Sequence, residues 1–142
     1  MKTPEELKQI EKSYKEEQDR KYKESEKKYK DEQEKKRITS IRQAELDVEK
    51  AVGLLEYKVS TGRIWTDNRG HKYYIIENYY NTYAKDGELK ECYFYDSQNK
   101  SYWKQLTRLL KQKGFNAQLD ATTNEVYDSM STYETYCIMI KL

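Results

Sequence analysis

Apolar side chains are distributed very unevenly along this chain, which limits where a hydrophobic core can form. After Met1, residues 1–37 contain only Leu7, Ile10, Tyr14, Tyr22 and Tyr29 as apolar side chains. The remaining residues hold twelve of the 15 tyrosines, both tryptophans and both phenylalanines. Because an ordinary domain needs about 100 residues and a sizeable core, we expect a folded C-terminal domain preceded by an appendage without a core.

The first 38 residues are expected to form a charged, solvated helical arm. Thr3 and Glu6 have the spacing of a capping box, and Pro4 suits the first helical position. No Gly or Pro interrupts the following thirty residues. Acidic residues precede basic ones by four positions repeatedly, an arrangement that stabilises exposed helices. These pairs are Glu16/Arg20, Glu17/Lys21, Asp19/Lys23, Glu24/Lys28, Glu26/Lys30, Asp31/Lys35 and Glu32/Lys36.

An internal repeat lies inside the arm. Residues 11–21 recur as residues 26–36, so Tyr14 and Gln18 are matched by Tyr29 and Gln33. A spacing of fifteen residues is close to four helical turns, which places both copies on a similar side of the helix. The repeat is interpreted either as a duplicated recognition surface or as low-complexity drift that preserves helicity.

Residues 39–58 are expected to form an amphipathic helix that joins the arm to the domain. Ser40 and Gln43 repeat the capping-box spacing and suggest a break or a bend. The spacing of Ile41, Ala44, Val48, Ala51 and Leu55 is that of a coiled-coil seam, sustained for only two heptads. This face therefore has two interpretations: packing against the C-terminal domain, or a homodimer seam over residues 38–55.

Residues 59–142 are expected to form a tyrosine-rich α+β domain. Strands are predicted over residues 63–66, 72–83, 89–95, 116–121 and 136–142, with a helix from residue 97 or 99 to 113 and a polar loop over 122–131. Asp86-Gly87 indicates a hairpin, and Gly114 suits a left-handed helix end. The fold class is α+β: a long charged helix, then an antiparallel sheet of about five strands with one packed helix, in the order α-α-β-β-β-α-β-β. The nearly continuous apolar run at 136–142 predicts a central strand.

Catalytic and cofactor chemistry finds little support in the sequence. The 27 basic and 25 acidic residues nearly cancel, unlike the concentrated basic excess of a duplex-DNA binder. His71 is the single histidine and falls in a polar turn, and no glycine-rich phosphate loop occurs. Asp67 with Glu88 and Lys90 has a metal-nuclease-like spacing, but its position suits a solvated strand end. We therefore expect no enzyme activity, no cofactor and no metal.

The chain is expected to be cytoplasmic, with its cysteines reduced. Residues 2–12 contain no apolar signal-peptide core, and no stretch of about twenty apolar residues occurs. Cys92 and Cys137 fall in apolar strands, where two thiols are more often reduced core residues than a disulfide.

Tyrosine is the remaining unusual feature, and it predicts a binding surface. Alternation along the strands places tyrosines on both faces of the sheet, one of which the helices over 39–58 and 99–113 would cover. Tyrosine is enriched in protein interfaces, and aromatic rings beside cations can also stack unpaired bases. The candidate partner-binding residues are Tyr73, Tyr79, Tyr80, Tyr83, Tyr93, Arg63, Arg69 and Lys72.

The composition carries a weak resemblance. Lys, Tyr, Asn and Ile are abundant, whereas Gly and Pro are scarce, as in AT-rich coding DNA. In size and bias the chain resembles the small accessory proteins of phages and mobile elements, a style that assigns no residue a role. The expected function is binding of a protein partner, with inhibition of a host defence or nucleic-acid enzyme. The alternatives are a single-stranded nucleic-acid or RNA binder and a coiled-coil assembly protein.

Overall fold

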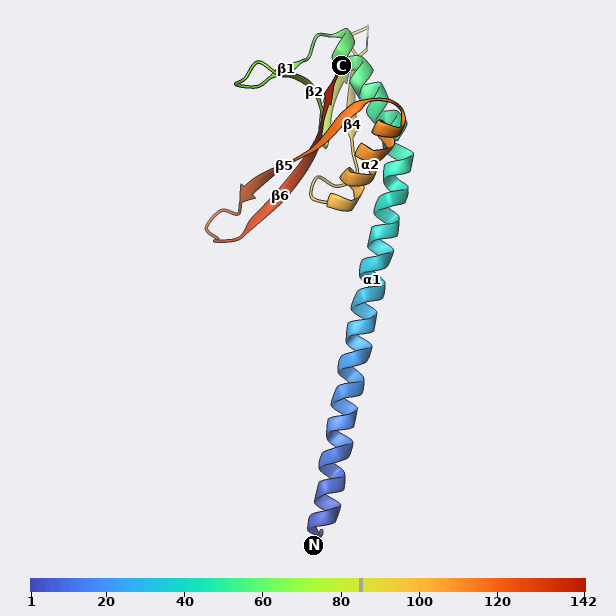
Figure 1. The fold of residues 1–142 in the computed structure, drawn as a ribbon, viewed down its shortest axis with the longest axis vertical. Helices are drawn as coiled ribbons and strands as arrows, with labels where there is room; N and C mark the ends of the chain where they lie inside the picture. The colour runs from blue at the N-terminus through green and yellow to red at the C-terminus, as the bar shows by residue number, and fades with distance from the viewer. Residues whose placement is uncertain (85) are drawn as a thin grey trace. The chain divides into compact units, whose positions relative to one another are not determined.

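The computed structural model describes residues 1–84 and 86–142, and it has the predicted α+β fold and element order. Figure 1 shows the long helix α1 (Pro4–Ser60) followed by the strands and by a second helix, α2 (Lys100–Gln112). The chain divides into two compact units, Met1–Lys36 and Arg37–Leu142. The first unit is the charged arm. The second contains the remainder of α1 and the whole tyrosine-rich domain, so the residues expected to join the two belong to the domain.

The arm is helical without burying any side chain. The amide of Glu6 donates to Thr3 Oγ1 at 3.3 Å, so Thr3 caps α1 as its spacing predicts. Ion pairs follow along the helix, including Glu17 with Lys21 and Glu26 with Lys30. Arg20 differs from expectation, because it pairs with Glu17 and Glu24 rather than with Glu16.

Helix α1 is continuous through Ser40, where the sequence suggested a break or a bend. Its segment 40–58 packs into the domain, and Ala44, Ala51, Leu54 and Leu55 are among the core residues. Of the two interpretations of this face, the structure therefore realises packing against the C-terminal domain. The side chain of Ser40 accepts a hydrogen bond from Asn99 Nδ2 at 2.6 Å, which explains why a capping residue is kept inside the helix.

Among the residues that the structure describes, six strands form two sheets instead of the single sheet expected. Strands β1 (Trp65–Thr66), β2 (Lys72–Ile76), β6 (Thr132–Lys141) and β5 (Asn116–Glu125) form an antiparallel sheet in that order. Strands β3 (Tyr79–Tyr83) and β4 (Leu89–Tyr93) form a separate antiparallel pair. The segment 72–83, expected as one strand, is divided at residues 77–78, with a bend at Asn78. As predicted, the last strand is central, because β6 pairs with both β2 and β5.

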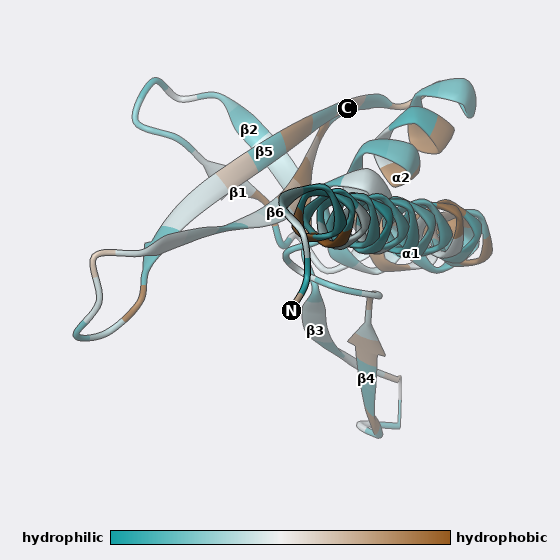
Figure 2. Ribbon diagram, turned by 90° about the horizontal axis from the view of Figure 1, so that it is seen from below, coloured by the Kyte–Doolittle hydropathy of each residue, from teal (hydrophilic) through white to brown (hydrophobic). Residues whose placement is uncertain are grey.

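The core lies between one face of the four-stranded sheet, α2 and the domain segment of α1. Ile76 of β2 and Ile138 and Ile140 of β6 belong to the same core cluster as three residues of α2, and all six are fully buried. The residues of α2 are Trp103, Leu106 and Leu110. Figure 2 shows the brown, hydrophobic colouring of β5 and β6 near the C-terminus and of one side of α2. The two helices therefore cover one face of this sheet, as we expected from the alternation of side chains along the strands.

Helix α2 has the ends that its sequence specifies. Asn99 Oδ1 accepts from the amide of Tyr102, which caps the N-terminus. At the C-terminus the amide of Phe115 donates to Leu110 and that of Gly114 to Lys111, the two bonds of a Schellman motif. Gly114 has φ of 96°, the left-handed conformation that favours glycine.

The β5–β6 hairpin is longer than expected. Residues 122–125 continue β5 and residues 132–135 begin β6, so the polar loop is confined to 126–131. The expected loop over 122–131 therefore begins four residues too early, whereas its end at residue 131 is confirmed. Thr122, Thr123 and Thr135 are β-branched and suit a strand. Their polarity reflects the exposure of this part of the hairpin to solvent.

Candidate protein-binding surface

One face of the β3–β4 hairpin gathers exposed aromatic side chains. The register pairs Tyr79 with Tyr93 and Tyr83 with Leu89, so these four side chains lie on the same face. Their exposed fractions are 42%, 52%, 53% and 50% in that order. Asn81 and Glu91, also paired, complete the group. We call these six residues the hairpin face: Tyr79, Asn81, Tyr83, Leu89, Glu91 and Tyr93.

Hydrogen bonds hold the rings of the hairpin face in place. The rings of Tyr79 and Tyr93 have their centroids 4.9 Å apart. The Tyr79 hydroxyl donates to Asn81 Oδ1 at 2.6 Å, and the Tyr93 hydroxyl donates to Glu91 Oε2 at 2.8 Å. The bond to the Glu91 carboxylate raises the pKa of Tyr93 to about 12. Rings ordered in this way lose less rotamer freedom when a partner binds.

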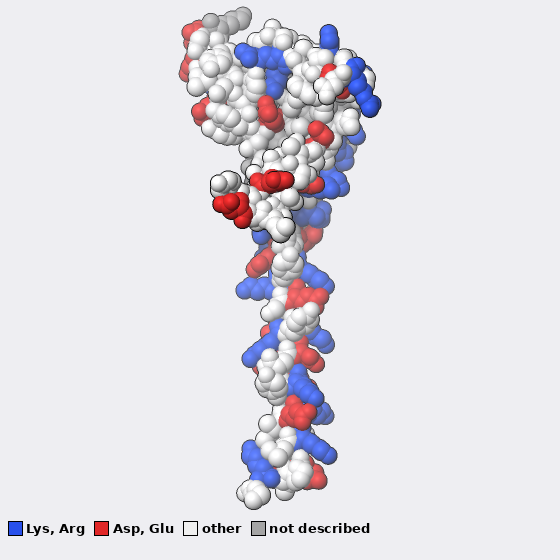
Figure 3. Space-filling model, turned by 90° about the vertical axis from the view of Figure 1, so that its left-hand side faces the viewer, with Lys and Arg blue, Asp and Glu red and all other residues white. Residues whose placement is uncertain are grey.

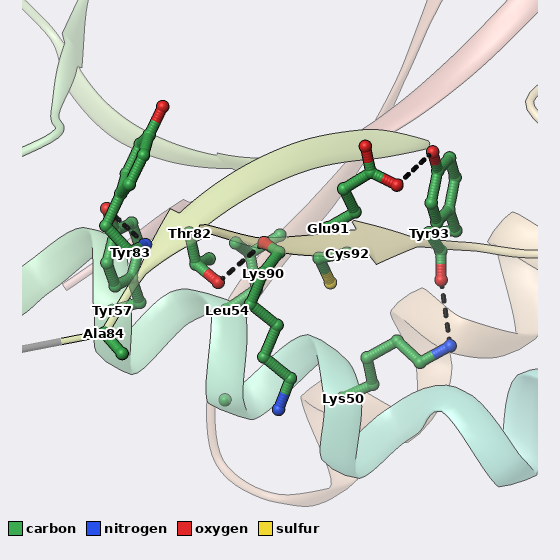
Figure 4. A pocket seen from close by; sticks show the side chains of 11 residues that line it. Lys50, Leu54, Tyr57, Thr82, Tyr83, Ala84, Lys90, Glu91, Cys92 and Tyr93 are labelled. Atoms are coloured by element: carbon green, nitrogen blue, oxygen red, sulfur yellow. Dashed lines mark hydrogen bonds between the residues drawn. The ribbon is translucent and has the colours of Figure 1, made fainter. Parts of the chain in front are cut away.

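The opposite face of the hairpin packs onto the domain and carries Tyr80. The Tyr80 ring packs edge-on against Tyr57 at 6.3 Å, and the Lys58 amine lies 4.0 Å from its centroid. In Figure 4, Cys92 and Lys90 point from β4 toward α1, whereas Tyr93 and Glu91 point away from it. Tyr80 is therefore half-buried and lies apart from the other candidate tyrosines of the hairpin.

Buried charge fixes this contact. Lys58 is 4% exposed, donates to the carbonyl of Ile75 at 2.6 Å and lies 3.7 Å from Glu77. Burial lowers its pKa, and the neighbouring Glu77 carboxylate opposes that shift. A buried ammonium needs such partners, so Lys58 ties α1 to both β2 and the hairpin.

A groove separates the hairpin from α1, with a cavity volume of about 530 Å³. Two hydrogen bonds cross it: Lys50 Nζ donates to the carbonyl of Tyr93 at 2.9 Å, and the amide of Tyr83 donates to the Tyr57 hydroxyl at 3.3 Å. The Lys90 amine has no hydrogen bond or ion pair among the described residues. The groove is lined by Lys50, Gly53, Leu54, Tyr57, Thr82, Tyr83, Ala84, Lys90, Glu91, Cys92 and Tyr93.

The other candidate residues lie outside the hairpin face. Tyr73 is in β2, where its ring lies 6.3 Å from that of Trp65. Arg63 lies over the Tyr57 ring at 5.9 Å. Arg69 belongs to the β1–β2 turn, where its amide donates to Asp67 Oδ1, and Lys72 begins β2. The candidate set is thus spread over both sheets and the segments beside β1, and only Tyr79, Tyr83 and Tyr93 share the hairpin face.

The outward face of the four-stranded sheet carries the carboxylates of Glu77 and Asp120, although we expected basic residues beside it. A hollow of about 540 Å³ lies there, with Trp65, Ile75 and Met139 among its apolar lining residues. Its charged lining residues are Glu77 and Asp120. Within the described chain, Asn78 Oδ1 is buried there without a hydrogen-bond partner. Burial raises the pKa of Cys137, which also lines the hollow, to about 11.

Leu89, Asn81 and Glu91 are residues of the hairpin face that sequence reasoning did not select. A two-residue Asp86-Gly87 turn would pair Tyr83 with Lys90, one position away from the observed register. The amide of Ala84 instead donates to the carbonyl of Glu88, and Tyr83 pairs with Leu89. A shift of one residue exchanges the faces of a strand. The turn type alone therefore did not identify these residues, because the register decides which of them share a face.

The remaining chemical candidates are dispersed. His71 is exposed and lies 3.4 Å from the Asp67 carboxylate in the β1–β2 turn, whereas Glu88 immediately precedes β4 and its carbonyl accepts from the amide of Ala84. Across residues 1–84 and 86–142, no three His, Cys, Asp or Glu side chains lie close enough together to hold a metal ion. In the same residues, no helix combines the length and apolar character needed to cross a membrane.

Comparison of the chain with protein-family models, curated proteins and solved structures found no match.

Proposed function

We propose that this chain is a non-enzymatic protein-binding protein and that the hairpin face contacts the partner. The observation that carries the proposal is the pairing of Tyr79 with Tyr93 and of Tyr83 with Leu89, four large side chains that are each about half exposed on one face. Tyrosine supplies a large contact area and is enriched among the residues that dominate interface energies. An exposed group of this kind, bordered by polar Asn81 and Glu91, is typical of an interaction surface.

Backbone groups at the hairpin edges add to this surface. The amide of Phe94 donates to the carbonyl of Asn78, and that of Ala84 donates to the carbonyl of Glu88. In the β3–β4 pair, the residues that are hydrogen-bonded to each other across the strands are therefore those with even numbers. The amides and carbonyls of residues 79, 81 and 83 in β3, and of 89, 91 and 93 in β4, therefore point outward. Two of these groups are already hydrogen-bonded: the Tyr93 carbonyl accepts from Lys50 at the β4 edge, and the Tyr83 amide donates to Tyr57 at the β3 edge. The other outward groups suit the addition of an extended partner segment.

Charge favours protein over nucleic acid at this surface. The only charged member of the hairpin face is Glu91, and its carboxylate accepts from Tyr93. A stacking platform for single strands combines aromatic rings with cations that neutralise phosphates. Lys90, the nearest cation in sequence, points to the opposite side of the hairpin (Figure 4). We therefore propose a protein partner, with single-stranded nucleic acid as the alternative outcome of the test.

The class of partner that we propose is a host defence or nucleic-acid enzyme, inhibited by occlusion. The supporting observation is the compositional resemblance to accessory proteins of phages and mobile elements. We also propose that the chain acts in the cytoplasm of that host.

The test compares affinity capture by the full chain with that by two double variants. Tyr83→Ala with Tyr93→Ala removes two rings of the hairpin face. Tyr127→Ala with Tyr133→Ala removes two exposed rings near the tip of the β5–β6 hairpin as a matched control. The partner should be retained by the wild type and the control and lost by the hairpin variant. The captured protein is then purified, and its affinity should fall at least about tenfold in the hairpin variant. Equal affinity for all three chains would overturn the proposal.

Nucleic-acid binding is tested separately with labelled single-stranded DNA and RNA at about 50 and 200 mM salt. A steep loss of affinity between these concentrations is typical of phosphate neutralisation. Such binding, if removed by the hairpin variant and kept by the control, would replace the protein partner with nucleic acid.

A further inference from the structure

The arm carries a continuous uncharged stripe along its helix. Every residue from Glu5 to Lys36 that lacks a charge belongs to the stripe, apart from Gln9 and Ser13. Its five apolar members are 48–71% exposed. Figure 3 shows white, uncharged side chains along the arm between blue and red ones. The arm stripe consists of Leu7, Ile10, Tyr14, Gln18, Tyr22, Ser25, Tyr29 and Gln33.

The arm stripe follows the fifteen-residue repeat. Its members are separated by three, four, four and four residues, and the cycle then begins again at Tyr22. Fifteen residues in four turns correspond to about 3.75 residues per turn, more than the 3.6 of a straight helix. A stripe with this period stays in contact with a neighbouring helix if the two wind around each other with a right-handed twist. The repeat is then a device for keeping one side of the arm in contact over its whole length.

We infer that the arm stripe is the interface through which two copies of this chain associate, as parallel helices in register. A partner helix must have the same period to follow the stripe. A second copy of this chain has that period because it has the same sequence. The polar members support the register. Gln18 and Gln33 each meet their own copy in such a pair, and a primary amide both donates and accepts hydrogen bonds. Polar residues within a helical seam fix register in this way.

Charges beside the stripe favour the parallel arrangement. On a helical projection with the repeat's period, Glu17 and Glu32 border one side of the stripe, and Lys15 and Lys30 border the other. In a parallel pair the two sides face each other, which places Glu17 opposite Lys15 of the second copy and Glu32 opposite Lys30. Lys21 similarly lies near Glu26 of the second copy. Like charges meet where Glu6 of one copy lies near Glu11 of the other, at the N-terminal end of the arm.

The position of this interface differs from the homodimer seam suggested over residues 38–55. Ala44, Ala51 and Leu55 of that seam are buried in the domain core. The arm stripe shares no residue with the hairpin face, so self-association of the arm and partner binding by the hairpin can fail separately.

Sedimentation equilibrium of the full chain over a wide concentration range tests the inference. The wild type should convert from monomer to dimer as concentration rises. Replacing Tyr14, Tyr22 and Tyr29 with Ser changes intrinsic helix propensity little and should weaken the dimer roughly tenfold or more. Lys12, Lys23 and Lys27 lie on the opposite side of the arm, and their replacement with Gln is the control that should leave the dimer unchanged. A wild type that stays monomeric, or equal dimerisation by all three chains, overturns the inference.

Cysteine cross-linking tests the orientation of the helices in the full chain. Gln18→Cys and Gln33→Cys, made separately, should each form disulfide-linked dimers under mild oxidation, beyond the background of the wild type with its two native cysteines. Gln9→Cys lies off the stripe and should not. In an antiparallel pair no more than one of the two stripe positions can meet its own copy, so cross-linking of a single position overturns the parallel register.

Discussion

The hydroxyl of Tyr102 in α2 donates a 2.5 Å hydrogen bond to Asp47 Oδ2 in α1, joining two residues that are 0% and 3% exposed. The other carboxylate oxygen of Asp47 accepts from Gln43 and lies 3.5 Å from the Lys50 amine. Lys50 in turn donates to the carbonyl of Tyr93. One buried carboxylate therefore connects the core contact between the helices to the edge of the hairpin.

Tyr102→Phe should destabilise the domain. The substitution keeps the ring and removes one donor from a buried carboxylate, and a hydrogen bond to a charged group contributes about 1.5–3 kcal/mol. Urea unfolding followed by near-UV circular dichroism measures the loss. Tyr95→Phe is the control, because Tyr95 is 45% exposed and its ring also contacts Tyr102. Equal stability of the Tyr102 variant and the wild type would show that the bond contributes nothing.

Alkaline pH should destabilise the wild type more than Tyr102→Phe. Burial, and next the hydrogen bond to Asp47, raise the pKa of Tyr102 far above its usual value of 10.0. The folded chain therefore keeps a proton that the unfolded chain releases as pH rises above about 10. The stability from this group is complete below pH 10 and is lost above it, by up to about 1.4 kcal/mol per pH unit.

Unfolding free energies measured between pH 8 and 11 check this linkage. The wild-type slope above pH 10 should be steeper than that of the Tyr102→Phe chain, because other titrating groups are common to both. Identical slopes would mean that Tyr102 ionises in the folded domain as it does in the unfolded chain.

Two glycine-to-alanine substitutions should have opposite effects on stability. Gly114 has φ of 96°, so Gly114→Ala should cost about 1 kcal/mol even though its new methyl group would meet no atom within 4 Å. Gly53 lies inside α1, where an added Cβ also meets nothing, so Gly53→Ala should stabilise the domain by about 0.5–1 kcal/mol. Thermal unfolding of the two variants and the wild type measures whether each substitution raises or lowers the stability of the domain. A stabilising Gly114→Ala would contradict the left-handed helix end.

The segment 37–142 should fold without the arm. All described residues from 1 to 36 are exposed, and the whole hydrophobic core lies in the second unit. Residues that bury nothing add little to the stability of the domain. Urea unfolding of the truncated and full chains, at a concentration where the full chain is monomeric and followed by near-UV circular dichroism, should therefore give matching curves. A molten or unfolded truncated chain would place part of the core stability in the arm.

Local signals accounted for most of the elements, whereas pairings between distant residues did not follow from the sequence. The caps at Thr3 and Asn99, the left-handed Gly114 and the apolar run of β6 each depend on neighbouring residues. The bend at Asn78 has no glycine or proline to mark it, so the segment 72–83 reads as one strand. The contact of Asp47 with Tyr102 joins residues 55 positions apart. No periodicity encodes such a pair.

The candidate surface was predicted only in part for the same reason. Tyr79, Tyr83 and Tyr93 could be selected by residue type, but their common face depends on the length of the connection after Ala84. Tyr80 differs from Tyr79 by one position and faces the core side, where Tyr57 and Lys58 contact it. Residue type thus identified the aromatic surface, and backbone register decided which rings belong to it.

The central place of β6 in its sheet also determines when the domain can fold during synthesis. Ribosomes complete α1, β2 and α2 before residues 132–141 exist, and until then the core that contains Ile76 and Leu110 lacks Ile138 and Ile140 of β6. The nascent domain must expose that apolar surface while the arm, which needs no core, is already helical. Molecular chaperones would therefore meet this protein through its unfinished sheet, before β6 is synthesised.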